Sequence, residues 1–161
     1  MSAALLFRDA RIVCPLTGER RGDLFVADGR IVDPADDAAE KATVIDCRGK
    51  LLMPAIVDLG VATIDRAAFR AGGIVRVGLM PDQSPVLDEP GIVQRSALIG
   101  RPDLWIHPIA AATRGLAGTD LAEMAICASA GARAVGTGRR WIGDSGVMAR
   151  VLAYAHDLGL T

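Results

Sequence analysis

The sequence predicts an α/β fold in two parts: a small antiparallel β module over residues 1–53, then repeated strand–helix units over residues 54–161. Three observations predict this. The first fifty residues alternate short apolar runs with turns. From Ala55 the apolar runs are those of buried parallel strands, and helical segments separate the later runs. With 161 residues, 51% of them hydrophobic and 23% charged, the chain can form one domain, or a small domain and part of a larger one.

The first part is expected to be a series of short strands joined by turns. Asp28-Gly29 between two apolar runs is a strong hairpin signal, because both residue types tolerate positive φ. Residues 34–41 form a polar, alanine-rich connection. The expected strands cover residues 5–7, 11–14, 23–27, 30–32, 43–46 and 50–53.

The second part is expected to be parallel. Its predicted strands cover residues 56–61, 74–80, 104–110 and 132–136. Its predicted helices cover residues 90–99, 120–130 and 146–158, with Asp88 or Glu89, Thr119 and Ser145 before their first turns. About four strand–helix units make half of a (β/α)₈ barrel, which leaves strand edges unpaired. We therefore expect either a fragment of a longer chain or a partner at the exposed edges.

Charge and cysteine content exclude several classes of function. The net charge of −1 gives no electrostatic basis for binding nucleic acid or an anionic membrane. Cys14, Cys47 and Cys127 are far apart and form no Cys-x-x-Cys pair, so we expect neither a disulfide framework nor a structural zinc site. No window approaches the ~18 apolar residues of a membrane span, and no secretory leader is expected at the start. These features predict a cytoplasmic protein.

Several runs resemble one family. Residues 107–124 (HPIAAATRGLAGTDLAEM) are similar to a characteristic run of the dihydroorotases, and residues 80–88 and 144–155 resemble two further runs of that family. Residues 49–54 (GKLLMP) resemble a lead-in that many amidohydrolases share. The resemblance implies a (β/α)₈ amidohydrolase barrel with a composite β-sandwich and one or two zinc ions at the strand C-termini. It also implies reversible cyclisation of carbamoyl-aspartate to dihydroorotate in pyrimidine biosynthesis.

The positions that carry the family's chemistry are substituted here. Residues 54–62 (PAIVDLGVA) resemble the first barrel strand, but Gly60 and Ala62 occupy the positions of its two metal-binding histidines. Asp82 stands at the position of the substrate-binding asparagine, where a carboxylate would repel a dicarboxylate substrate. Residues 136–139 (GTGR) replace the strand-4 segment that supplies a metal-binding aspartate. No catalytic or metal-binding residue is predicted, zinc is the cofactor of active relatives alone, and Asp82 is the single candidate substrate contact.

Other polar residues have two interpretations each. His107 is interpreted as a hydrogen-bonded structural residue rather than a ligand, since zinc needs at least three protein ligands. Asp82 and Asp144 could form a general acid/base pair, but Asp88 and Asp144 are better explained as residues that precede or cap helices. Residues 137–140 could bind an anion or form a solvated loop.

The resemblance leads to one main hypothesis and two alternatives. The first is a pseudoenzyme: a dihydroorotase-like protein that lacks the zinc ligands and acts as a structural partner of aspartate transcarbamoylase, as inactive homologues do. The second is an active metal-dependent cyclic amidohydrolase whose remaining ligands lie in a missing C-terminal half. The third is a half barrel that self-associates through its open edges.

Overall fold

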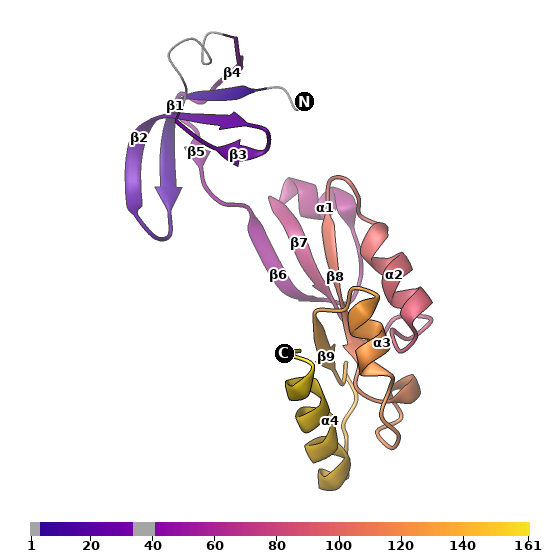
Figure 1. Ribbon diagram of the computed structural model, residues 1–161. Coiled ribbons are helices and arrows are strands. Elements are labelled where there is room, and N and C mark those ends of the chain that lie inside the picture. The colour runs from indigo at the N-terminus through magenta and orange to yellow at the C-terminus, as the bar shows by residue number, and fades with distance from the viewer. Residues whose placement is uncertain (1–3, 34–40) are drawn as a thin grey trace. The chain divides into compact units, whose positions relative to one another are not determined.

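The computed structural model describes residues 4–33 and 41–161, and the chain divides into two compact units, Met1–Pro54 and Ala55–Thr161 (Figure 1). The first unit contains strands and turns. The second contains a parallel sheet with helices between its strands. This is the predicted mixed α/β architecture, and the second unit is consistent with part of a (β/α)₈ barrel.

The described part of the first unit holds one five-stranded sheet. Its strands are β1 (Leu5–Cys14), β2 (Gly18–Ala27), β3 (Arg30–Ile31), β4 (Thr43–Asp46) and β5 (Leu51–Leu52). The order is β3-β2-β1-β4, and β5 also pairs with β1. The two hairpins are antiparallel, but β4 and β5 run parallel to β1. The expectation of an antiparallel module is therefore wrong for these two strands, because they join β1 through longer connections than a tight turn.

The turns of this unit follow their sequence signals. Asp28 and Gly29 both have positive φ, 48° and 74°, and form the predicted turn between β2 and β3. The two short strands predicted before Cys14 are instead one strand with a register shift between Phe7 and Ala10. At this bulge Asp9 has φ 55°, and its N–H donates to Asp23 Oδ1 at 2.8 Å. The predicted connection at residues 34–41 lies, except for its last residue, outside the described residues.

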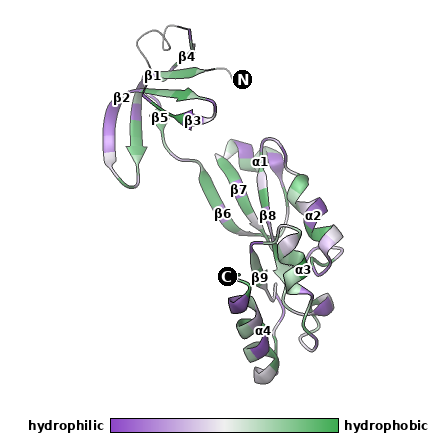
Figure 2. Cartoon of the chain, in the orientation of Figure 1, coloured by the Kyte–Doolittle hydropathy of each residue, from purple (hydrophilic) through white to green (hydrophobic). Residues whose placement is uncertain are grey.

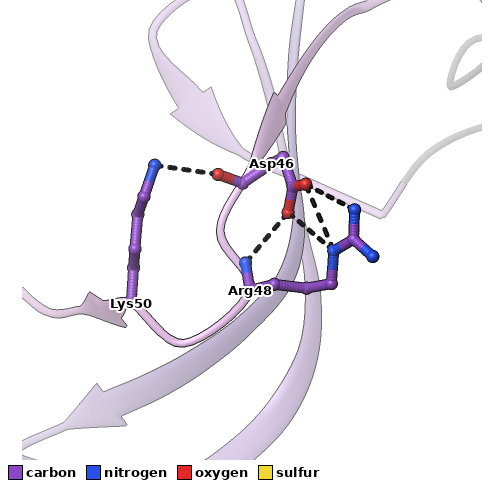
Figure 3. Close-up of polar contacts among 3 residues, drawn as sticks. All are labelled: Asp46, Arg48 and Lys50. Atoms are coloured by element: carbon purple, nitrogen blue, oxygen red, sulfur yellow. Dashed lines mark hydrogen bonds and ion pairs between the residues drawn. The ribbon is translucent and has the colours of Figure 1, made fainter.

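A small polar network closes the turn from β4 to β5 (Figure 3). The Asp46 carboxylate accepts a hydrogen bond from the Arg48 backbone N–H at 3.0 Å and another from its guanidinium at 2.8 Å. Lys50 Nζ donates to the Asp46 carbonyl oxygen at 3.1 Å. The hydrogen bonds from Arg48 lower the pKa of Asp46 to about 2. The Asp46 carboxylate is therefore charged at neutral pH, and its hydrogen bonds with Arg48, two residues away, stabilise the turn.

The second unit is built on a four-stranded parallel sheet. Strands β6 (Ile56–Val61), β7 (Ile74–Leu79), β8 (Trp105–Ala111) and β9 (Ala134–Gly136) lie in chain order. The helices are α1 (Arg66–Ala71), α2 (Pro90–Leu98), α3 (Met124–Ser129) and α4 (Ser145–Asp157), with a 3₁₀ turn, η1, at Arg114–Leu116. Figure 2 shows β6 and β7 as predominantly hydrophobic strands. All four predicted strands are confirmed, and their observed ends differ from the predicted ends by at most two residues.

One helix starts later than predicted, and another was not predicted at all. Helix α3 begins at Met124 rather than residue 120, because Leu121 forms an antiparallel bridge with Thr113 and holds the preceding segment extended. The Thr119 hydroxyl donates to the Asp120 carboxylate instead of capping the helix. Helix α1 had no sequence prediction, although Asp65 gives it a cap by accepting from Ala68 N–H at 3.0 Å.

Two predicted caps are also corrected. Asp144 rather than Ser145 caps α4, since its Oδ1 accepts from Val147 N–H at 2.8 Å. Asp88 does not cap α2. Its Oδ2 accepts from Gly115 N–H at 2.7 Å and so joins the start of α2 to the turn after β8. Asp144 therefore has the capping role that was its preferred interpretation, whereas Asp88 precedes α2 without capping it.

Helices pack against one face of the parallel sheet. Alternate residues of β7 and β8 point into this core, with Val77 fully buried and Ile106 3% exposed. They contact α2 through Val93 and α3 through Cys127, which is the predicted core position. A second cluster joins Ala112, Met124, Ile142, Val147, Val151 and Ala155 around α4. The opposite face of the sheet, which carries Arg76 and Trp105 and which we call the open face, has no helical cover among the described residues.

No helix of the described chain has the length and apolar character needed to cross a lipid bilayer.

Candidate functional site

The carboxyl ends of β6–β9 form the edge at which a parallel α/β barrel places its reactive groups. Because β6–β9 are parallel and adjacent, the residues that follow each strand lie along this one edge. They include Ala62 after β6, Asp82 after β7, Thr113 after β8 and Arg139 after β9. The site therefore brings together three of the segments that sequence analysis considered separately.

The end of β6 carries no ligating side chain at the two positions of interest. Gly60 donates its N–H to Asp58 Oδ1 at 3.1 Å, and a Cβ added at Gly60 would lie 3.8 Å from Met80 Sδ. The Ala62 carbonyl accepts from Gln83 Nε2 at 3.1 Å. The same amide nitrogen donates to the Met80 carbonyl at 3.0 Å. This end of the strand is thus fixed through backbone groups.

Gln83 is a positioning residue that the sequence analysis missed. Its amide joins the carbonyl that follows β6 to the carbonyl that follows β7. A backbone carbonyl near a barrel opening must find a donor if water does not reach it, and this side chain supplies two such bonds. The only sequence signal was its place directly after Asp82, which does not predict a bridge to a strand 21 residues away.

Asp82 forms an ion pair across the strand ends. Arg139 Nε donates to Asp82 Oδ2, which connects the segment after β7 to the segment after β9. The Asp82 side chain is 13% exposed, whereas that of Arg139 is 79% exposed. The hydrogen bond from Arg139 is the main cause that lowers the pKa of Asp82. Asp82 is therefore an anion with its charge already matched by a guanidinium.

The backbone beside this pair is fitted to it. Gly138 has φ 61°, and a Cβ at this residue would lie 3.1 Å from Asp82 Cβ and 3.2 Å from its Cγ. Glycine therefore satisfies both the left-handed conformation and the close approach. Asp82 Oδ1 is buried and accepts no hydrogen bond within the described chain. A depression of about 380 Å³ adjoins the pair and is also lined by Gln83, Leu116 and Arg140.

His107 lies apart from this edge, in the middle of β8. Arg76 donates a hydrogen bond to His107 Nε2 at 3.3 Å, in agreement with the predicted structural role. Partial burial is the largest cause that lowers the pKa of His107, and the positive charges of Arg76, Arg133 and Arg101 add to it. The imidazole is accordingly neutral at pH 7 and acts as an acceptor.

The donor set at the strand ends does not fit a zinc site of the kind that the family resemblance implies. Gly60 and Ala62 offer no ligand atom, and the carboxylate of Asp82 is held by a cation that would repel a second one. Across residues 4–33 and 41–161, no three His, Cys, Asp or Glu side chains are grouped as a metal centre would require. The described edge can instead bind an anion through Arg139 and Arg140, or support protein structure.

Comparison with known proteins finds dihydroorotases among the sequence relatives of this chain. The chain is 34% identical to the dihydroorotase of Pelotomaculum thermopropionicum, over 97% of this chain and 40% of that protein. It is also 34% identical to the dihydroorotase of Mycobacterium tuberculosis, over 93% of this chain and 39% of that protein. The chain therefore spans about 40% of the length of the curated relatives it matches. No family model matches the sequence.

A solved structure supports the fold independently. The L-hydantoinase from Arthrobacter aurescens superposes with a TM-score of 0.65 over 99% of this chain and 40% of that protein. At 17% identity this likeness concerns the fold alone. The chain is thus similar in sequence to dihydroorotases and similar in fold to this L-hydantoinase.

Proposed function

We propose that the chain belongs to a non-catalytic dihydroorotase-like protein that serves as a structural partner of aspartate transcarbamoylase in pyrimidine biosynthesis. The observation that carries the first half of this proposal is the Asp82–Arg139 ion pair at the strand ends. The partner comes from the family resemblance, and the cytoplasmic location remains the expectation drawn from the cysteine content. Dihydroorotase relatives at 34% identity support the choice of family from which these expectations are taken.

The chemistry of the strand ends supports the absence of hydrolysis. Metal-assisted hydrolysis of a cyclic amide needs a cation that polarises the carbonyl and activates a water, and catalytic zinc is normally held by three protein ligands. At the end of β6, the two positions at which the family carries metal-binding histidines are Gly60 and Ala62. The one carboxylate at the end of β7 is neutralised by Arg139. A zinc ion placed here would have to displace a guanidinium from a largely buried carboxylate.

The alternative is an active cyclic amidohydrolase of the dihydroorotase type. It is favoured by one observation: the matched relatives are called dihydroorotases, and this chain spans about 40% of their length. Further strands of a longer protein could then provide ligands. Such an enzyme would have to hold its metal without the first-strand pair at Gly60 and Ala62.

The test measures activity, metal content and assembly on the same purified protein, expressed from its complete reading frame. We expect dihydroorotate hydrolysis at the background rate, with and without added zinc, and no stoichiometric zinc by mass spectrometry. The dihydroorotase of Mycobacterium tuberculosis is the positive control for the assay. Zinc-dependent hydrolysis above background would establish the alternative.

The partner is tested separately by mixing the protein with aspartate transcarbamoylase from the same organism. We expect a complex of defined mass in sedimentation equilibrium, and an effect on the activity or the assembly state of the transcarbamoylase. Sedimentation of the two proteins as independent species would overturn the partner assignment while leaving the conclusion on catalysis unchanged.

A further inference from the structure

A groove on the helix-covered side of the sheet lies between the connection that follows β6 and helix α2. It has a volume of about 490 Å³, within the range of pockets that hold small organic molecules. Its walls are residues 62–64 after β6, residues 83–85 after β7 and one side of α2. Helix α1 has six residues and packs mainly against β7, so it leaves this side of α2 open. The groove therefore belongs to the helix layer and is separate from the open face.

The lining of this groove is mostly apolar. Leu79 and Leu87, which are 3% and 0% exposed, belong to the helix-covered core and also line the groove. Ile92 and Ile99 line it from α2, and Ile99 is 52% exposed. A Cβ added at Gly91, a further lining residue, would meet no atom within 4 Å. An aliphatic group bound here would therefore cover apolar surface that is now accessible to water.

Ser96 contributes a hydroxyl to the lining without a partner in the chain. The residue is 7% exposed, and its side chain forms no hydrogen bond with any described residue. A helical serine normally has a partner within reach: Ser129 in α3 donates to the Ala125 carbonyl at 3.0 Å. A buried hydroxyl that lacks a hydrogen bond costs free energy, and an acceptor on a bound molecule would remove this cost.

Arg95 gives the groove its charge. Among the described residues it is the one charged residue in the lining, and no described carboxylate lies within ion-pair distance of it. Arg95 is exposed and directly precedes Ser96 on α2. The two side chains together offer a guanidinium and a hydroxyl beside an aliphatic lining. This combination favours a ligand with one negative charge and an apolar body.

We propose that the groove binds a small aliphatic monocarboxylate, of the kind of a medium-chain fatty acid. Its carboxylate accepts hydrogen bonds from Arg95 and Ser96, and its chain packs against the isoleucines of α2 and the leucines of the core. The inference rests on α2 and not on the Asp82–Arg139 pair, so it stands whether or not the proposed function is correct.

The test titrates octanoate into the protein expressed from its complete reading frame, with isothermal calorimetry as the measurement. Octylammonium has the same chain with the opposite charge, and acetate has the carboxylate without the chain. We expect saturable binding of octanoate, about tenfold weaker binding of octylammonium, and no saturable binding of acetate. Equal binding of octanoate and octylammonium would overturn the proposal, because the apolar lining alone would then account for it. Absence of saturable octanoate binding would also overturn it.

Variants assign the binding to the two polar residues. Arg95→Gln should weaken octanoate binding by about fivefold, whereas Arg150→Gln on the exposed side of α4 should leave it unchanged. Ser96→Ala should also weaken it by about fivefold. Ser96→Ala should not lower the unfolding temperature of the ligand-free protein, because the hydroxyl has no partner there to lose. An unchanged octanoate affinity in either folded variant would contradict the assignment.

A third variant tests the location without removing a polar group. Gly91→Leu adds an aliphatic side chain to the lining at a position with free space, and leucine is favoured over glycine in a helix. We expect this variant to fold, as judged by circular dichroism, and to lose saturable octanoate binding. A folded Gly91→Leu protein that binds octanoate as tightly as the wild type would place the ligand elsewhere.

Discussion

The two faces of the β6–β9 sheet are made by neighbouring residues of the same strands, yet they are chemically opposite. On β7, Val77 is fully buried against the helices, while Arg76 lies beside Trp105 on the open face. On β8, Ile106 is 3% exposed in the core, while His107 accepts a hydrogen bond from Arg76. Because side chains alternate between the two faces of a strand, the same strand can place apolar residues in the helix-covered core and polar residues on the opposite face.

The largest expected difference between the faces is in packing energy. Ile106→Ala should lower the free energy of unfolding by about 2–4 kcal/mol, because it leaves a cavity in the helix-covered core. Val57→Ala on the open face should lower it by no more than about 1 kcal/mol, because Val57 pairs in register with Arg76 and its side chain is 51% exposed. Urea denaturation followed by tryptophan fluorescence reports on this unit, since both tryptophans belong to it. Equal losses in the two variants would mean that the open face is buried in solution.

The next effect concerns the closest backbone approach on the open face. A Cβ added at Gly78 would lie 2.5 Å from the Leu59 carbonyl oxygen and 3.4 Å from Ile109 Cδ1. Gly78→Ala should therefore lower the free energy of unfolding by about 1–3 kcal/mol, since β6 and β7 must move apart. Gly91→Ala is the matched control. Nothing lies within 4 Å of its added Cβ, and alanine in a helix gains up to about 1 kcal/mol. A neutral Gly78→Ala would show that the strand pair is loosely held.

The smallest expected effect is the loss of stability when Arg139, which pairs with Asp82, is replaced. Arg139→Gln should destabilise the second unit by about 1 kcal/mol at pH 7, because it removes the partner of Asp82. The pKa of Asp82 is lowered in the folded chain, so its contribution is complete above the unfolded pKa of about 3.9 and is lost as the pH falls through the folded pKa.

The difference between wild type and Arg139→Gln should therefore shrink below about pH 4. Urea denaturation at a series of pH values measures it. Arg150→Gln, which removes an exposed arginine from α4, should give no such pH dependence. A difference that stays constant to low pH would show that Arg139 acts through packing rather than through its charge pair with Asp82.

Local signals in the sequence predicted most of the elements. The parallel strands follow from their short apolar runs, and the β2–β3 hairpin follows from Asp28-Gly29. The errors have physical causes. Helix α3 starts late because the Thr113–Leu121 bridge, a contact between distant residues, holds its predicted first turn extended. The capping ability of Asp88 was recognised, but its actual partner, Gly115, lies 27 residues away.

The candidate site shows the same division. The resemblance to dihydroorotases identifies Gly60, Ala62 and Asp82 as substituted positions from the sequence alone. The bond from Gln83 to the Ala62 carbonyl was not predictable, because an amide side chain gives no indication of which strand end it will reach. Likewise, nothing in the separate segments around residues 82 and 139 indicates that their charges pair.

The sequence by itself determined the α/β order, the parallel strands and the chemical types available at each strand end, because these depend on local pattern and residue identity. Only the tertiary structure decided which of those groups meet. It placed Arg139 on Asp82 across the ends of β7 and β9, and it placed Arg76 and Arg101 over Trp105 on the open face. The physical reason is that ion pairs and cation–π contacts join residues far apart in the chain, whose distances are set by the packing of the whole sheet.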